Sequence, residues 1–320
     1  MKILMFGRGV MATQYGWALE KAGNEVEFYV RPGRTAQYGP YVDLDMLDGR
    51  KNRKGDPVRE RWFITMREEI SADHDYDLIF LSVNHEQFEE AAKVVSEWAG
   101  KATILIFNNV WDDQETVAAR LPKEQILWGF PGGGGGFRGK NKLEAGFMKS
   151  IYLESAATAA SGKRHKKVVN LLQQAGFSVS LQKDMYVWYL QHFIMNAGMA
   201  AQALKMGSYQ KMYQSPKHVK PAVLLMREML PLIRAKGRKP SLGTTLMLRL
   251  PAGLMGYGVY KVITGGTLAG AIMERMENTA YISQESFALF PRDILAEARK
   301  LGIELPRLTA LEPYFRKKDL

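Results

Sequence analysis

A glycine-rich stretch near the start of the chain has the residue types and the spacing of a phosphate-binding turn. Residues 7–12 read Gly-Arg-Gly-Val-Met-Ala and follow a short apolar run that is typical of a strand. The first glycine of such a pattern permits a tight turn, the second leaves room for a pyrophosphate, and the alanine lets a helix pack close to a sheet. Free N–H groups at the start of that helix bind phosphate oxygens. We therefore predict a dinucleotide site formed by Gly7, Gly9, Val10, Met11 and Ala12, with a purely structural glycine turn as the alternative.

The residue after the second expected strand indicates which dinucleotide would bind. Sites that prefer NAD carry an acidic residue there, which accepts hydrogen bonds from the ribose hydroxyls. Here the strand at residues 26–30 is followed by Arg31, whose guanidinium suits the additional phosphate of NADP. We predict NADP(H) as the cofactor; the alternative is that Arg31 is an ordinary solvated loop residue.

Polar side chains follow two further strands of the expected sheet. Asn84 and Gln87 come shortly after one apolar run, and Asn109 follows the next. Ligands of open parallel sheets bind beyond the carboxyl ends of the strands, so we expect all three to line the cofactor site and Asn109 to face the nicotinamide. His85 either contacts the adenosine part or simply caps a helix.

A long helix expected at residues 184–204 carries the candidate proton donor. Its sequence is apolar nearly all round, which indicates a buried helix, and His192 and Asn196 lie four residues apart on one face. Reducing a keto group requires a hydride and a proton donor near the developing alkoxide. Histidine titrates near neutral pH, so His192 is a candidate donor and Asn196 a candidate for orienting the carbonyl. The alternative is that His192 is a hydrogen-bonded core residue.

The elements that must position these residues belong to two domains of different class. In the first half, short runs rich in Val, Ile, Leu and Phe alternate with helical stretches, which is typical of a mostly parallel sheet covered by helices. A small polar stretch, residues 155–162, marks the expected boundary, and the second half is mostly helical, with a break or kink near Pro291. We predict an α/β Rossmann domain at residues 1–160 and a mainly α-helical domain for substrate binding and dimerisation at residues 161–320.

Composition narrows the classes of protein further. The 320 residues include no cysteine, and the five histidines lack the spacing of metal ligands, so we expect no disulfide and no metal. No apolar run is long enough to span a membrane and no secretory signal is visible, so we expect a cytoplasmic protein without a stable membrane span. The formal net charge of +11 comes from scattered residues, which favours a small anionic partner over nucleic acid.

Two segments are unusual in composition. Residues 132–136 are five glycines, which predicts either a mobile loop over the substrate, with Arg138 placed to bind a carboxylate, or a flexible surface turn. Residues 242–273 are rich in Gly, Met and Leu. For this segment we favour a buried helix pair or a homodimer interface, and the alternative is a surface that contacts lipid or a long apolar substrate.

Four stretches of the chain resemble the ketopantoate reductase (2-dehydropantoate 2-reductase) family. They are the glycine pattern followed by Arg31, Asp-Leu-Ile-Phe-Leu-Ser-Val-Asn-His-Glu-Gln at residues 77–87, Ile-Leu-Ile-Phe-Asn-Asn-Val at 104–110, and Leu-Gly-Ile-Glu-Leu-Pro at 301–306. The resemblance implies a fold like that of 6-phosphogluconate dehydrogenase, with a Rossmann and a helical domain. It also implies the reduction of a 2-oxo acid by NADPH in the cleft between them.

The resemblance is that of a divergent member. With Asn196 as the anchor, the position of the family's lysine holds His192 and that of its second asparagine holds Ala200. Asn84 stands where the family often has lysine, and Glu285 is the best match for a glutamate on the family's last helix. The catalytic candidates are therefore His192, Asn196, Asn109 and Glu285.

We predict an NADPH-dependent oxidoreductase that reduces a small 2-oxo acid such as 2-dehydropantoate, or a related carbonyl compound, and that forms a homodimer. The missing lysine leaves a second class open, a protein that binds NADPH without turnover as a sensor or regulator. A third class, motivated only by the positive charge, is a binder of nucleic acid or of a lipid surface, and its binding to nucleic acid would depend steeply on salt.

Overall fold

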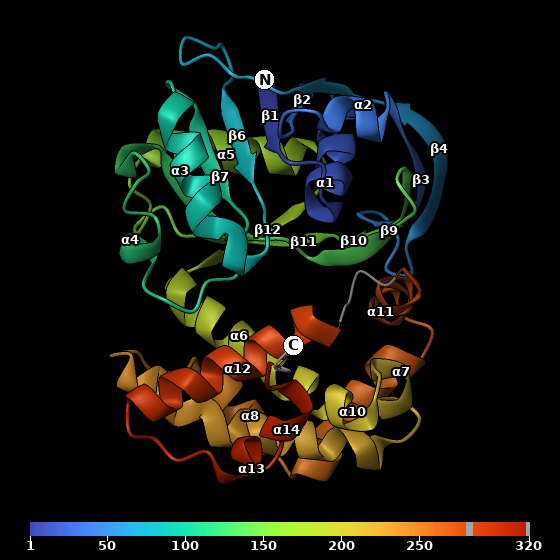
Figure 1. Cartoon of the computed structure of the whole chain (residues 1–320), viewed down its shortest axis with the longest axis vertical. Coiled ribbons are helices and arrows are strands. Elements are labelled where there is room, and N and C mark those ends of the chain that lie inside the picture. The colour runs from blue at the N-terminus through green and yellow to red at the C-terminus, as the bar shows by residue number, and fades with distance from the viewer. Residues whose placement is uncertain (280–283, 318–320) are drawn as a thin grey trace. The chain divides into compact units, whose positions relative to one another are not determined.

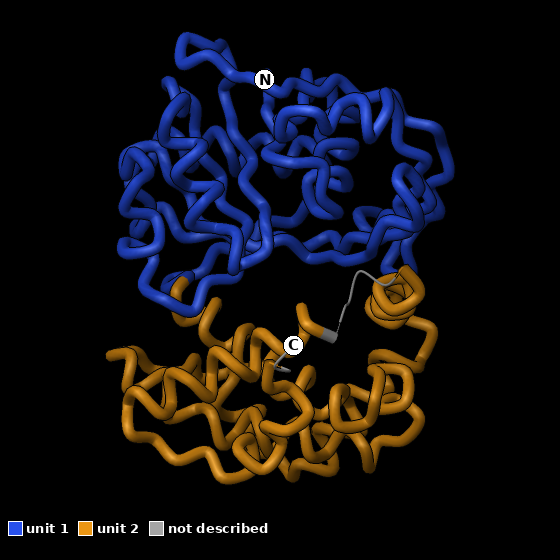
Figure 2. Tube along the Cα trace, viewed as in Figure 1, with its two compact units in different colours: residues 1–185 blue, residues 186–320 orange. Residues whose placement is uncertain are grey.

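The chain forms two compact units. The structure is a computed structural model and describes residues 1–279 and 284–317. Unit 1 comprises residues 1–185 and unit 2 residues 186–320 (Figure 2). The boundary follows Met185 instead of residue 160, because the strand at Ser178–Gln182 pairs with a strand of unit 1.

An eight-stranded sheet forms the centre of unit 1 (Figure 1), with the strand order β12-β11-β8-β7-β6-β1-β2-β5. Neighbouring strands are parallel except β8 and β11, which are antiparallel. The central strands are apolar and buried throughout, as expected of a parallel sheet covered on both faces. The strands are β1 (Lys2–Phe6), β2 (Glu25–Tyr29), β5 (Thr65–Arg67), β6 (Leu78–Leu81), β7 (Thr103–Ile106), β8 (Ile126–Phe130), β11 (Ser150–Glu154) and β12 (Ser178–Gln182).

Helix α1 (Val10–Glu20) is buried on nearly all sides. It contacts β1 and β2 of the main sheet and also β9 and β10 of a second sheet, so little of its surface is exposed and even Thr13 and Gln14 are buried. The ring of Tyr15 is fully buried among four phenylalanines, Phe80, Phe107, Phe147 and Phe177. The other helices and turns of unit 1 are α2 (Arg34–Tyr38), η1 (His85–Gln87), α3 (Phe88–Trp98), α4 (Gln114–Val117), η2 (Lys123–Gln125) and α5 (Gly162–Gln174).

The second sheet joins two distant parts of the chain in the order β4-β3-β10-β9. Strand β3 (Tyr41–Gly49) is antiparallel to β4 (Asp56–Phe63) and parallel to β10 (Lys142–Met148), which in turn is antiparallel to β9 (Gly133–Arg138). In Figure 1 the blue β3 and β4 meet the green β9 and β10 beside α1. Most of this sheet was not expected from the sequence.

The glycine run belongs to this sheet, so its prediction as a mobile loop or a surface turn was wrong. A Cβ on Gly135 would come within 2.4 Å of the backbone of Ala145, so only glycine lets β9 lie this close to β10. Arg138, predicted to bind a substrate carboxylate, binds the Glu144 carboxylate of β10 in this structure, at 2.8 and 2.9 Å.

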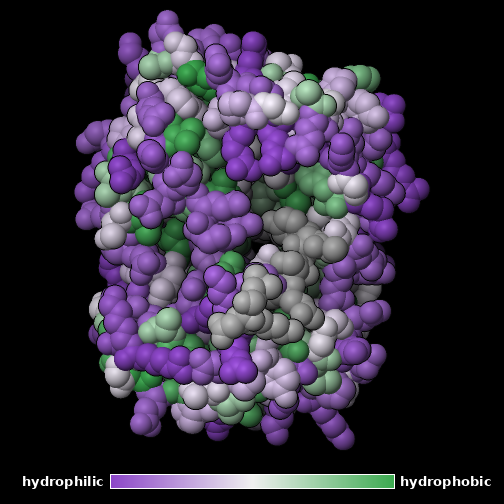
Figure 3. All heavy atoms as spheres, viewed as in Figure 1, coloured by the Kyte–Doolittle hydropathy of each residue, from purple (hydrophilic) through white to green (hydrophobic). Residues whose placement is uncertain are grey.

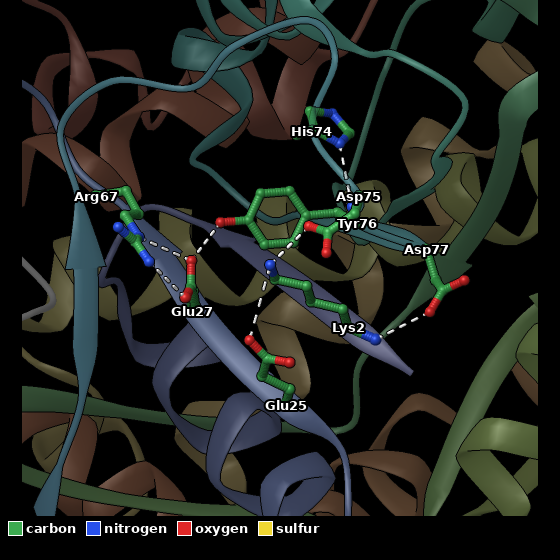
Figure 4. A network of polar contacts seen from close by, with 8 residues as sticks. All are labelled: Lys2, Glu25, Glu27, Arg67, His74, Asp75, Tyr76 and Asp77. Carbon is green, nitrogen blue, oxygen red and sulfur yellow. Dashed lines mark hydrogen bonds and ion pairs between the residues drawn. The ribbon is translucent and has the colours of Figure 1, made fainter.

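A polar network ties together the amino-terminal ends of the central strands (Figure 4). The Lys2 ammonium at the start of β1 contacts the carboxylates of Glu25 and Asp75, and the Lys2 amide donates to Asp77. Within β2, Glu27 accepts hydrogen bonds from Arg67 and Tyr76. Lys2, Glu25, Asp75 and Asp77 lie at the edge opposite to the carboxyl ends, whereas Arg67 ends β5. All of these residues have partners within the network, so we assign them a structural role.

Unit 2 is helical throughout its described residues. Gly198 lets α6 and α8 approach closely, because a Cβ there would lie 3.0 Å from the Ala222 carbonyl oxygen. The helix that contains Pro291 continues through it, so the break or kink expected there is not a helix end. The helices are α6 (Met185–Met206), α7 (Tyr209–Met212), α8 (Pro216–Ala235), α9 (Leu242–Arg249), α10 (Ala252–Thr264), α11 (Leu268–Asn278), α12 (Gln284–Lys300), α13 (Pro306–Thr309) and α14 (Glu312–Phe315).

Hydrophilic residues cover most of the face shown in Figure 3. Among the residues that the structure describes, none of the helices combines the length and the apolar character needed to cross a bilayer.

Candidate functional site

The strand order of the main sheet reverses direction at β1. From β1 the chain proceeds through α1 to β2 on one side, and β6, β7 and β8 follow on the other side. Ligands of open α/β sheets bind beyond the carboxyl ends of the strands at such a reversal. The segments that leave β1, β2, β6 and β7 at this edge contain Gly7, Arg31, Asn84 and Asn109, so the structure brings four predicted residues to one edge of the sheet.

The glycine turn has the geometry that a bound phosphate requires. Gly7 has φ +82°, a left-handed conformation, and its N–H donates to the Tyr29 carbonyl oxygen at 2.8 Å. Gly9 precedes α1, and apart from Gly9 and its two chain neighbours no described atom lies within 4 Å of the position that a Cβ on Gly9 would take. No side chain caps α1 and its first turn holds no acidic residue, while Ala12 is fully buried. Open space thus adjoins free N–H groups at the start of a helix, which suits an anion.

Arg8, between the two glycines, is a functional candidate that the sequence interpretation missed. It is only 8% exposed, and its guanidinium lies 4.3 Å from the ring centre of Tyr38 and 4.7 Å from that of Phe137. One of its N–H groups donates to the Lys140 carbonyl, but Nε and Nη1 have no partner among the described residues. Burial lowers the pKa of Arg8 to about 10, so the group is still charged at neutral pH. A buried cation without a carboxylate partner is costly, which favours an anionic ligand here.

The loop after β2 is held by a carboxylate from the neighbouring strand. Arg31 is exposed to solvent. Just beyond it, the N–H groups of Gly33 and Thr35 donate to Glu68 at 2.9 and 2.7 Å, and these bonds lower the pKa of Glu68. Glu68 follows β5, which pairs with β2. The sequence interpretation did not single it out, because its place depends on that pairing.

The segment after β6 presents the remaining predicted cofactor residues at the surface. Asn84 and Gln87 are both exposed, and the Gln87 N–H donates to the Asn84 carbonyl to close the turn η1. His85 lies beside Glu86, with Nδ1 3.6 Å from a carboxylate oxygen.

Two neighbouring asparagines at the end of β7 have opposite surroundings. The buried Asn108 binds both backbone groups of Val83: it donates to the carbonyl at 2.5 Å and accepts from the N–H at 3.3 Å. It therefore fixes the end of β6 to the end of β7. The side-chain amide of Asn109 is also shielded from solvent, yet neither its oxygen nor its nitrogen has a partner within the described chain. Buried amides without partners are costly, so Asn109 is the member of the pair that a ligand would satisfy.

This contrast gives opposite expectations for two alanine variants. Asn108→Ala leaves the backbone groups of Val83 without partners and should lower the free energy of unfolding by about 1–3 kcal/mol. Asn109→Ala removes a buried amide that has no partner and should leave the stability of the ligand-free protein unchanged or slightly higher. Thermal unfolding without ligand compares the two, and an equal loss of stability would contradict the assignment.

The predicted residues of unit 2 lie on two helices. On α6, His192 stacks on Trp188, with ring centres 5.0 Å apart and planes at 10°. Desolvation lowers the pKa of His192 to about 4, so its imidazole is neutral at pH 7. Asn196 is partly exposed one turn further, and Ala200 is buried. Glu285 lies on α12, where Arg292 binds its largely exposed carboxylate at 2.7 Å and lowers its pKa.

Comparison of the sequence with models of known protein families gives a match that includes the glycine turn. Residues 3–157 match the model of the family described as ketopantoate reductase PanE/ApbA. A search of curated protein sequences gives no match to this chain.

Solved structures with the same fold cover nearly the whole chain. A D-mandelate dehydrogenase in a ternary structure with NADH and anilino(oxo)acetate is 15% identical with a TM-score of 0.71, and covers 98% of this chain and 97% of its own. The 2-dehydropantoate 2-reductase from Geobacter metallireducens GS-15 is 16% identical with a TM-score of 0.70, and the match covers 98% of this chain and 99% of the reductase. The ketopantoate reductase from Staphylococcus aureus, described as dimeric, is 12% identical with a TM-score of 0.66, and the match covers 99% of this chain and 98% of that reductase.

These similarities confirm the predicted fold class, an N-terminal Rossmann domain with a mainly helical C-terminal region. Residues 3–157 of this chain therefore match the ketopantoate reductase PanE/ApbA family, and the whole chain has the fold of solved reductases described by that name.

Proposed function

We propose that this protein is an NADPH-dependent oxidoreductase that reduces a small 2-oxo acid, such as 2-dehydropantoate, or a related carbonyl compound. The observation that carries the proposal is the open, uncapped start of α1 beside the buried Arg8, inside a domain that matches a reductase family. A fold neighbour bound to NADH and anilino(oxo)acetate supports nicotinamide chemistry on such a compound.

The residues of unit 1 have distinct proposed roles toward the dinucleotide. The turn from Gly7 to Ala12, with the N–H groups of Val10 and Met11, would hold the pyrophosphate, and Arg31 would bind the phosphate on the ribose. Asn84 and Gln87 would contact the ribose and nicotinamide side, and the unsatisfied amide of Asn109 would bind the nicotinamide or the substrate. When bound, the cofactor supplies the hydride that reduces the keto carbon.

The residues of unit 2 have proposed roles toward the substrate. His192 is neutral at pH 7, so it would donate a hydrogen bond from an uncharged imidazole to the carbonyl oxygen as negative charge develops there, and the proton that completes the hydroxyl group would come from water. Asn196, on the same face of α6, would orient that carbonyl. Glu285 is a weaker candidate, because Arg292 already binds its carboxylate.

The cofactor preference is tested by titrating the protein with NADPH and with NADH while following nicotinamide fluorescence. We expect NADPH to bind at least about tenfold more tightly, and Arg31→Ala to remove most of that preference. Arg53→Ala, an exposed loop arginine elsewhere in unit 1, is the matched control and should bind both nucleotides like the wild type. The Glu68 carboxylate lies close to the Arg31 loop and would repel the additional phosphate of NADPH. Tighter binding of NADH than of NADPH would overturn the assignment of NADP but not that of a nicotinamide cofactor.

Turnover separates this proposal from the second candidate, a protein that binds NADPH as a sensor. The low pKa of His192 favours this alternative, since a neutral imidazole is a weak proton donor. The test is a screen of 2-oxo acids for NADPH oxidation, with His192→Ala as the comparison. Oxidation that decreases in the variant supports the reductase, and tight NADPH binding without oxidation of any 2-oxo acid supports the sensor.

A further inference from the structure

Helices α9 and α10 of unit 2 expose an unusual number of large apolar side chains. The exposed fractions run from 47% for Leu250 to 74% for Leu242. The exposed residues of α9 are spaced by four and one, those of α10 by three and five, and Leu250 lies between the two helices, so each helix presents apolar side chains to solvent. We call this set the exposed apolar face; it consists of Leu242, Leu246, Met247, Leu250, Leu254, Tyr257 and Val262.

Within residues 1–279 and 284–317, the chain does not cover this face with its own packing. Helix α10 packs against α8 through its small residues, Ala252 and Gly256. A Cβ on Gly256 would lie 3.0 Å from the backbone nitrogen of Lys220, so the two helices are in close contact on that side. Leu254, Tyr257 and Val262 of α10 therefore point toward solvent, while the small residues of the helix face α8.

The charges within the segment that carries the exposed apolar face have one sign. Between Glu228 and Glu274 the sequence contains no acidic residue but six basic ones, Arg234, Lys236, Arg238, Lys239, Arg249 and Lys261. Lys236 is paired with Glu297 of α12, and Lys239, Arg249 and Lys261 are exposed. An open pocket of about 520 Å³ adjoins α9 at Thr245, and Arg234, Arg238 and Lys239 line it without any carboxylate.

We propose that this face binds the surface of an anionic phospholipid bilayer. Apolar side chains beside Lys and Arg are the chemistry of proteins that lie on a membrane, where the side chains enter the headgroup boundary and the cations attract anionic lipids. Leu242, Leu246 and Leu254 supply the apolar part, and the cationic pocket beside α9 accepts a lipid phosphate.

The same charges argue against a second copy of the chain as the occupant. A two-fold symmetric contact brings the same surface of both copies together. The cations of this segment would then lie against the same cations of the other copy, and the segment has no acidic residue to pair with them. Like charges juxtaposed in this way oppose association. The homodimer interface predicted for residues 242–273 is therefore the competing outcome of the test.

The test is co-sedimentation of the full chain with vesicles of phosphatidylcholine alone or mixed with phosphatidylglycerol, at low ionic strength and without nucleotide. We expect binding to the anionic vesicles only, weakened by added salt. The double variant Leu246→Ser/Leu254→Ser and the double variant Lys239→Glu/Arg249→Glu should each lower the partition coefficient at least about tenfold. All four side chains are exposed, so folding should be unaffected, as a thermal melt would show.

Matched controls come from unit 1. Phe63→Ser removes an exposed apolar side chain and Lys51→Glu reverses an exposed charge, and both should bind vesicles like the wild type. The proposal is overturned if the wild type ignores anionic vesicles or if the two double variants bind like the wild type. It is also overturned if the wild type sediments as a dimer that Leu246→Ser/Leu254→Ser converts to a monomer, because a second copy would then occupy the face.

Discussion

Replacing Gly9 by valine should abolish dinucleotide binding while leaving the fold intact. The space beside the Gly9 Cα contains no described atom within 4 Å apart from Gly9 and its two chain neighbours, and the φ of −76° at Gly9 is accessible to any residue, so a side chain there meets no resistance from the protein. That same space is where a pyrophosphate must approach the backbone at the start of α1. We expect the affinity for NADPH to fall by at least about a hundredfold, which corresponds to about 3 kcal/mol, with an unchanged melting temperature.

Two other glycines provide the comparison. Gly162 is also exposed, stands at the start of α5 and has open space around it, so Gly162→Val should change neither binding nor stability by much. Gly7 has φ +82°, and Gly7→Ala should lower the free energy of unfolding by about 1–2 kcal/mol from backbone strain alone. Full NADPH affinity in Gly9→Val would show that no phosphate occupies this turn.

Glu154→Gln should stabilise the protein at pH 8 by up to about 3 kcal/mol and have little effect at pH 5. Glu154 ends β11 and is 6% exposed, and its carboxylate accepts one hydrogen bond, from the Trp128 N–H at 2.8 Å. Desolvation raises its pKa from an ordinary value of 4.5 to about 7. Between these values the folded state holds a proton that the unfolded state has lost, so stability decreases as the pH rises from about 4.5 to 7 and then levels off. Glutamine is uncharged at every pH, so the Glu154→Gln variant does not lose stability as the pH rises.

Glu144 is the control, because its pKa is shifted in the opposite direction to that of Glu154. Its hydrogen bonds with Arg138 lower its pKa to about 2, so its contribution to stability is present above pH 4.5 and disappears as the pH falls toward 2. Glu144→Gln should therefore destabilise the protein at pH 8, where Glu154→Gln stabilises it. Melting temperatures of the two variants at pH 5 and pH 8 measure both effects, and a stabilisation by Glu154→Gln that does not depend on pH would contradict its buried-charge origin.

The parts of the fold that the sequence predicted depend on local signals. The turn from β1 into α1 follows from glycine spacing and an apolar run, and both lie within a dozen residues. Strand β3 has an equally local signal that was overlooked, since Val42, Leu44 and Met46 are buried and alternate with aspartates. Strand β9 has no such signal, because glycines have no side chains to form a pattern and only the partner β10 determines its course.

The same distinction separates the site residues. Arg31 and Asn109 follow strands, so their approach to one edge of the sheet was predictable from the order of elements. Glu68 reaches the Arg31 loop only through the pairing of β5 with β2, which no local pattern reveals. The buried state of Arg8 likewise depends on Tyr38 and Phe137, from a helix and a strand that the sequence did not predict.

The parallel pairing of β3 with β10 also determines the order in which the chain can fold during synthesis. The hairpin of β3 and β4 leaves the ribosome early, but the edge of β3 stays without its partner until residues 142–148 have been made. Until then the hydrogen-bonding edge of β3 and the apolar side chains of Val42, Leu44 and Met46 lack their native cover, which is the state in which strands associate wrongly. Helix α1 also depends on β9 and β10 for one of its faces. The glycine turn before α1 is thus synthesised well before the strands that cover α1, and the nascent first half must be kept from aggregating until β10 arrives.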